Sequence, residues 1–185
     1  MDKFILNKEH GAAFLLLVGW SHAARVGNVA TLMKKNFEDA DLESITWSKA
    51  KTTARIGKYT TASSYGNYTQ FLQDHMKDKK PTEPLCSTYD LDKLRTALKV
   101  EDSSHDLRSL RRGALQTLAK SGTDVPTLLH FSGHTSEKSL MRYLGWGAKF
   151  SKGIQNAKGA AKAALVPSST RMKSESPTRM SAIAI

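Results

Sequence analysis

The longest apolar stretch of the chain, residues 12–20, is the feature that most limits its fold. A membrane-spanning helix needs roughly 20 apolar residues, and this stretch is far shorter. A signal peptide is also disfavoured, because Glu9 and His10 precede the stretch and no small-residue cleavage site follows it. We therefore expect residues 9–20 to form a buried helix, and we expect neither a transmembrane nor a secreted protein.

Composition sets the size of the fold and its chemical environment. The chain has 185 residues, of which 39% are hydrophobic, enough for one globular domain or for one domain and a tail. Its single cysteine, Cys86, excludes an internal disulfide and a cysteine-based zinc cluster. A lone cysteine fits a reducing compartment.

The net charge indicates a polyanionic partner. The formal net charge is +11 and the isoelectric point is near 9.8, values typical of nucleic-acid-binding proteins. Residues 144–185 contain seven Lys and Arg residues and one acidic residue. This segment therefore carries just over half of the excess positive charge, and we expect its lysines to bind DNA without sequence preference.

Periodicity predicts a mainly helical chain. The expected helices cover residues 9–20, 25–35, 67–79, 88–99, 103–121, 126–132 and 136–144. Residues 44–62 are rich in β-branched residues and favour a strand–turn–strand unit. From residue 166 onward Pro, Ser and Thr dominate without periodicity, which predicts disorder.

The helix over 103–121 carries basic residues opposite its leucines. His105, Arg108 and Arg112 share this face. Taken alone, such a face is usually a solvated surface. Four arginines are candidate phosphate contacts that we expect to be surface charge: Arg55, Arg111, Arg112 and Arg142.

One ordered set of polar residues goes beyond a basic surface, and it consists of Arg25, Lys51, His105, Arg108, Gly133-His134 and Tyr143. It resembles the catalytic domain of the tyrosine recombinases (integrases), which share their chemistry with type IB topoisomerases. The segments that carry the resemblance are Arg25-Val-Gly-Asn-Val-Ala-Thr-Leu32, His105-Asp-Leu-Arg108 and Ser132-Gly-His-Thr-Ser through Arg142-Tyr143.

The resemblance implies an α+β, mainly α fold: a helical core with a small antiparallel sheet of about three strands. Residues 1–147 would form the catalytic domain, and residues 148–185 a basic C-terminal helix and disordered tail. The family's N-terminal core-binding domain, which clamps DNA, is expected to be absent.

The resemblance also implies a role for each residue. Arg25 and Arg108 would hold the scissile phosphate, and His134 would add a hydrogen bond. Tyr143 would be the nucleophile and form a 3′-phosphotyrosine with a free 5′-hydroxyl, while His105 would accept its proton. No metal and no cofactor are implied, and His130 and His134 form no zinc pair because Gly133 separates them.

The acid for the leaving oxygen would be a lysine from the turn of the hairpin. Lys49, Lys51 and Lys58 are the candidates. We choose Lys51 because Lys51-Thr52 resembles the family's K-T pattern.

These implications define a function and one alternative. The function is site-specific breakage and rejoining of double-stranded DNA by a mobile-element recombinase that acts as a homo-oligomer. We expect it to act inside the cell, in the nucleus or the cytoplasm. We expect neither a membrane partner nor a small-molecule substrate. Asn28 replaces the family's usual carboxylate three residues after the first arginine. The alternative is therefore a truncated or catalytically decayed DNA-binding module.

Overall fold

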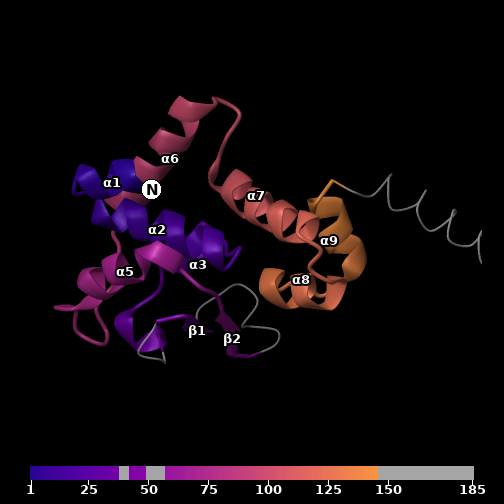
Figure 1. The fold of residues 1–185 in the computed structure, drawn as a ribbon, viewed down its shortest axis with the longest axis horizontal. Coiled ribbons are helices and arrows are strands. Elements are labelled where there is room, and N and C mark those ends of the chain that lie inside the picture. The colour runs from indigo at the N-terminus through magenta and orange to yellow at the C-terminus, as the bar shows by residue number, and fades with distance from the viewer. Residues whose placement is uncertain (38–41, 49–56, 146–185) are drawn as a thin grey trace, which may run out of the picture. The chain divides into compact units, whose positions relative to one another are not determined.

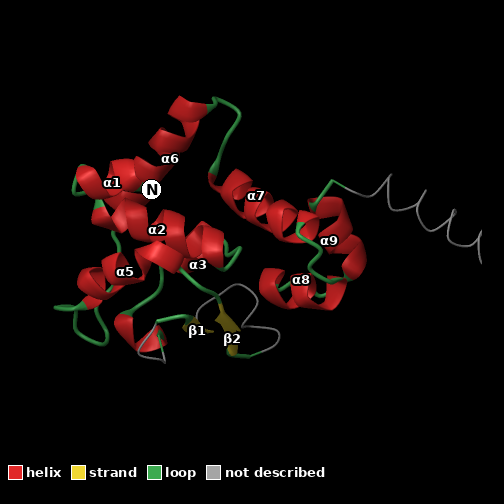
Figure 2. Ribbon diagram, viewed as in Figure 1, coloured by secondary structure: helices red, strands yellow, loops and turns green. Residues whose placement is uncertain are grey.

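The computed structural model describes residues 1–37, 42–48 and 57–145, and most of these are helical (Figure 1). The helices are α1 (Asp2–Leu6), α2 (His10–Ser21), α3 (Val26–Val29), α5 (Thr69–Met76), α6 (Thr88–Glu101), α7 (Leu107–Lys120), α8 (Val125–Ser132) and α9 (Glu137–Tyr143). The strands are β1 (Ser44–Trp47) and β2 (Tyr59–Ala62), and two 3-10 turns cover Lys34–Asn36 and Gly66–Tyr68. The predicted mainly helical fold with a small antiparallel sheet is confirmed (Figure 2).

Helix α2 is buried, as its apolar sequence predicts. Phe14, Leu15 and Val18 have no exposed surface. The helix contacts α1, α3, α5, α6 and α7, so apolar side chains are needed on every face (Figure 1). None of the helices in the described part of the chain is both long and apolar enough to span a bilayer.

Helix α7 joins two groups of buried side chains. Leu110 belongs to the main core around α2, and α7 also contacts α3 and α8. Farther along α7, Leu115 is fully buried, as are Leu128 of α8 and Leu140 of α9. The helix starts where Asp106 caps it and ends before Gly122, whose φ is +89°. Helix α7 therefore fixes the last two helices against the rest of the domain.

The two strands pair antiparallel, with Ser44 opposite Ala62 and Trp47 opposite Tyr59. The predicted strand–turn–strand unit is confirmed at its strands, while most of its turn lies outside the described residues. The expectation of about three strands is wrong for the described chain, which has two. A single bridge between Phe37 and Ile45 stands beside them.

The helix predicted over residues 25–35 is much shorter than expected. It ends at Val29, and by Met33 the backbone is extended and bridges Pro84. Leu85 donates its N–H to the carbonyl of Leu32 over 3.2 Å. This pairing with a distant segment outweighs the helical periodicity of the local sequence.

A buried hydrogen-bond network joins α2 to β2. His22 is 1% exposed; its Nδ1 lies 2.8 Å from Thr61 Oγ1 and its Nε2 lies 2.7 Å from Tyr65 Oη. Trp47 Nε1 donates to the same Thr61 hydroxyl over 2.7 Å. Burial lowers the pKa of His22 to about 4, so the imidazole is neutral at pH 7.

This network makes stability depend on pH. In the unfolded chain His22 has a pKa near 6.5, so only the unfolded state gains a proton between pH 6.5 and 4. We expect the free energy of unfolding to fall over that window, by on the order of 3 kcal/mol from His22. Urea unfolding at stepped pH measures this. A His22→Gln variant should show a smaller decrease, and an unchanged decrease would contradict the assignment.

Candidate active site

The first half of α7 brings two arginines to one pocket. The Asp106 carboxylate accepts hydrogen bonds from the backbone N–H groups of Arg108 and Ser109, which starts the helix at this point. Arg108 and Arg111 are three residues apart and therefore share a face. Both line a pocket of about 250 Å³. The side chain of Arg108 is exposed, whereas that of Arg111 is only 4% exposed.

The third arginine of the pocket, Arg25, comes from the joint between α2 and α3. Ala23 turns the chain there with a φ of +44°, and Arg25 then stands as the extended N-cap of α3. Among the described residues, no acidic group forms an ion pair with Arg25. The remaining residues of the pocket are Val26, Gly27, Leu107 and Tyr143.

Arg111 is held by backbone carbonyls instead of carboxylates. Its Nη1 donates to the carbonyl of Ala23 over 3.0 Å, and its Nη2 donates to the carbonyl of Ser132. Its Nε is buried without a hydrogen-bond partner in the described chain. Burial, and then the charge of Arg25, lower the pKa of Arg111 to about 10. Arg111 therefore stays charged at neutral pH and links the Arg25 joint to the end of α8.

Tyr143, the last residue of α9, lies among these cations. Its hydroxyl donates to the carbonyl of Arg108 over 3.3 Å. The guanidinium carbons of Arg111 and Arg112 lie 5.8 Å and 5.7 Å from the centroid of its ring. These distances are typical of cation–π contacts, which hold the ring beside the pocket.

His134 follows the glycine that ends α8. Gly133 adopts the left-handed conformation, with a φ of +57°, and turns the chain so that the imidazole of His134 reaches Tyr143. The two ring centroids are 5.3 Å apart. Nδ1 of His134 is buried and has no hydrogen-bond partner in the described chain. Burial, and then the charges of Arg111 and Arg25, lower the pKa of His134 to about 4.

The structure does not bring every predicted site residue to this pocket. His105 lies exposed before α7, with its Nε2 3.7 Å from Asp102 Oδ2, and it is not part of the lining. His134 is not part of the lining either, although it contacts Tyr143, which is. Lys49 and Lys51 lie outside the described residues. Lys58 is exposed and does not line the pocket.

The expectation that Arg111 is a surface charge is wrong. Its position in the helical pattern carried the signal: Arg111 is four residues after Leu107 and four before Leu115, within the apolar stripe of α7. A charged residue inside such a stripe is buried, and a buried charge needs hydrogen-bond partners.

The chemistry of the pocket suits an anion. Its lining supplies three guanidinium groups and one phenol. Within residues 1–37, 42–48 and 57–145, no three His, Cys, Asp or Glu side chains gather into a group that could hold a metal. Planar guanidinium groups bind phosphate oxygens well, because they stay charged and can donate two hydrogen bonds together.

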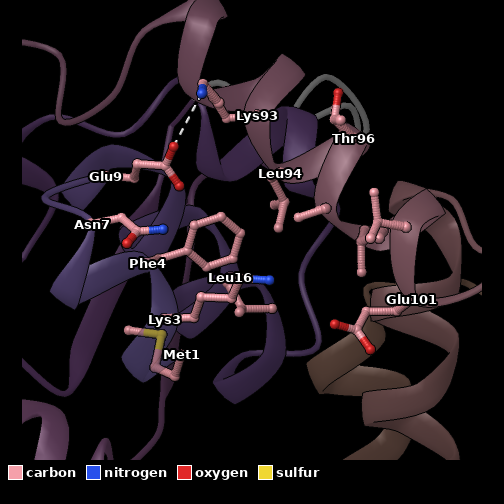
Figure 3. A pocket seen from close by; sticks show the side chains of 13 residues that line it. Met1, Lys3, Phe4, Asn7, Glu9, Leu16, Lys93, Leu94, Thr96 and Glu101 are labelled. Atoms are coloured by element: carbon pink, nitrogen blue, oxygen red, sulfur yellow. Dashed lines mark ion pairs between the residues drawn. The ribbon is translucent and has the colours of Figure 1, made fainter.

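A second pocket, of about 350 Å³, has a different lining (Figure 3). It is formed largely by apolar side chains of α1, α2 and α6, among them Phe4, Leu16 and Leu94. Two of the four charged residues that line it, Glu9 and Lys93, pair with each other over 3.1 Å. Its described lining includes no arginine, histidine or tyrosine, so it does not share the cationic chemistry of the first pocket.

Solved structures of the Tn1549 transposon integrase share this fold. One, in complex with transposon right end DNA, has a TM-score of 0.56 and 14% identity, over 82% of this chain and 60% of the integrase chain. Another, in complex with a circular intermediate DNA, has a TM-score of 0.51 and 15% identity, over 83% of this chain and 62% of that one. This chain thus spans about three fifths of the integrase chains. No family model and no curated protein matches it.

Proposed function

We propose that this chain breaks and rejoins DNA strands through a covalent 3′-phosphotyrosine on Tyr143. The observation that carries the proposal is the convergence of Arg25, Arg108, Arg111 and Tyr143 on one pocket, from three separate parts of the chain. The fold shared with DNA-bound transposon integrases supports the same function. The proposed partner is double-stranded DNA, bound by a homo-oligomer as in a mobile-element recombinase.

In this proposal the arginines stabilise the charge that develops on the phosphate. Attack on a phosphodiester places negative charge on its non-bridging oxygens, and fixed positive donors lower the energy of that state. Arg25 has no acidic partner in the described chain and is available to clamp the phosphate. Arg111 adds a buried charge and a free Nε–H, while Arg108 stands at the exposed edge.

The bond changes follow from this placement. The Tyr143 oxygen attacks phosphorus, the bond to the 5′-oxygen breaks, and a free 5′-hydroxyl leaves. Because the phosphotyrosine is a phosphodiester, the hydroxyl of another strand reverses the step without ATP. Lys51 is the proposed acid for the leaving oxygen, with Lys49 and Lys58 as alternatives. The two candidate proton acceptors are His105 and His134.

A trapping assay tests this function. The protein is incubated in EDTA with a library of nicked duplexes of randomised sequence, in which the short fragment with the free 5′-hydroxyl diffuses away after cleavage and leaves the protein attached to DNA. We expect a covalent adduct from the wild type and none from Tyr143→Phe, because phenylalanine has no nucleophilic oxygen. Equal melting temperatures and equal DNA binding of the two proteins serve as the control. An adduct of equal yield in Tyr143→Phe would contradict the proposal.

The second candidate function is a DNA-binding module without catalysis. The observation that favours it is Asn28, a neutral residue where the resembled family has a carboxylate to orient its first arginine. This alternative predicts salt-dependent DNA binding and no adduct from any member of the library.

A further inference from the structure

We infer that His134 accepts the phenolic proton of Tyr143, and that the bound phosphate makes it able to do so. This inference rests on the proposed function and assigns the proton-transfer step that the family resemblance gave to His105.

Geometry favours His134 as the acceptor. Its ring centroid is 5.3 Å from that of Tyr143, with an angle of 51° between the planes. Its Nδ1 is buried and has no hydrogen-bond partner in the described chain, so in the tautomer without a proton on Nδ1 it offers an unused acceptor. Neither histidine lines the pocket, but His134 contacts the ring of Tyr143, whereas His105 is exposed and faces Asp102.

The charges around His134 explain why it would act only with substrate bound. The charged groups acting on it are Arg111 from α7 and Arg25 from the α2–α3 joint, and Tyr143 of α9 is the titratable neighbour in contact. Burial, and then the charges of the two cations, hold the pKa of His134 at about 4, so the free protein has a neutral but weakly basic imidazole. A phosphate anion bound to these arginines offsets their charge, and the pKa of His134 then rises.

The proton and the bonds balance in both directions. Tyr143 first leaves its hydrogen bond with the carbonyl of Arg108. Its proton moves to Nδ1 of His134, its oxygen bonds to phosphorus, and the leaving 5′-oxygen takes a proton from the proposed hairpin lysine or from water. In rejoining, the incoming 5′-hydroxyl returns its proton to the hairpin lysine or to water and attacks phosphorus; the bond from phosphorus to the Tyr143 oxygen breaks, and that oxygen takes the proton back from His134.

The test separates a base from an acid and from a simple phosphate contact. Duplexes recovered from the trapping library are made with sulfur in place of the 5′-bridging oxygen, because a thiolate leaves without an acid. We expect His134→Asn, which keeps an N–H donor but no basic nitrogen, to form adduct about 10²–10⁴-fold more slowly with either substrate. We also expect added imidazole to restore part of the rate in His134→Ala. His130→Asn is the matched control, since His130 is exposed on α8 and its Nε2 lies 3.2 Å from the Thr60 carbonyl, away from the pocket lining.

A second measurement does not depend on a variant of the buried histidine. NMR titration of His134 in the Tyr143→Phe protein should give a pKa near 4 without DNA and a higher value with a recovered duplex bound. An unchanged pKa would overturn the coupling between phosphate and base.

Other outcomes also contradict the inference. His134→Asn within threefold of the wild type, a defect that vanishes with the sulfur substrate, or a comparable loss in His105→Asn instead would each overturn it. Absence of any adduct from the wild type would overturn the proposed function and this step with it, so the two failures are distinguishable.

Discussion

Replacing Arg111 by methionine is expected to slow adduct formation about 10³-fold or more while changing the free energy of unfolding by no more than about 3 kcal/mol. Two opposing effects explain the small change in stability. Losing the hydrogen bonds to the Ala23 and Ser132 carbonyls destabilises the fold by about 1–3 kcal/mol each. Burial lowers the pKa of Arg111 to about 10, so removing this cation restores on the order of 3 kcal/mol.

Single-turnover trapping and urea unfolding measure the two effects separately. Arg111→Lys is the informative companion, because lysine keeps the charge but not the planar fork that reaches both carbonyls. The binding of DNA should raise the melting temperature of the wild type more than that of Arg111→Met. A variant that forms adduct at the wild-type rate would exclude Arg111 from the site.

Replacing Arg25 by glutamine is expected to slow adduct formation about 10²–10³-fold with little effect on stability. Arg25 is only partly buried, and no acidic group pairs with it in the described chain, so the fold loses little when its charge is removed. The plot of log DNA affinity against log salt concentration should become less steep by about one, as expected for the loss of one phosphate contact. Trapping, melting and salt-dependent binding measure the three quantities.

Arg142→Gln is the matched control for Arg25→Gln. Arg142 is exposed on α9 and does not line the pocket. We expect this variant to bind DNA somewhat more weakly while keeping the rate of adduct formation. Equal losses of rate in the two variants would indicate that Arg25 acts only through general electrostatic attraction.

Local signals in the sequence were sufficient for the helices that carry the site. Gly122 marks the end of α7 and Gly133 marks the end of α8, because left-handed glycines are local devices. The predicted start of α7 at residue 103 is four residues too early, since the cap is Asp106 and the helix begins at Leu107. The strands near residues 44 and 62 were also predictable, since β-branched residues mark them. The short α3 was not, because Leu85 and Pro84 pair with its continuation from more than fifty residues away.

The sequence did not show which face at the start of α7 points inward, and this limited the prediction of the site. The resemblance selected His105 and Arg108 from their order and spacing, whereas the structure places Arg108 and Arg111 in the pocket and His105 outside it. The partners of Arg111 are the backbone carbonyls of Ala23 and Ser132. Every residue type has a backbone carbonyl, so the sequence does not reveal these partners. Such contacts depend on tertiary structure alone.

The most direct test of the account is to locate the covalent bond. Adduct trapped from the wild-type protein is digested with protease and nuclease, and the peptide that carries a nucleotide is sequenced by mass spectrometry. The account predicts a nucleotide joined through its 3′-phosphate to Tyr143, with a free 5′-hydroxyl on the released strand. A nucleotide on another residue, or one joined through its 5′-phosphate, would contradict it.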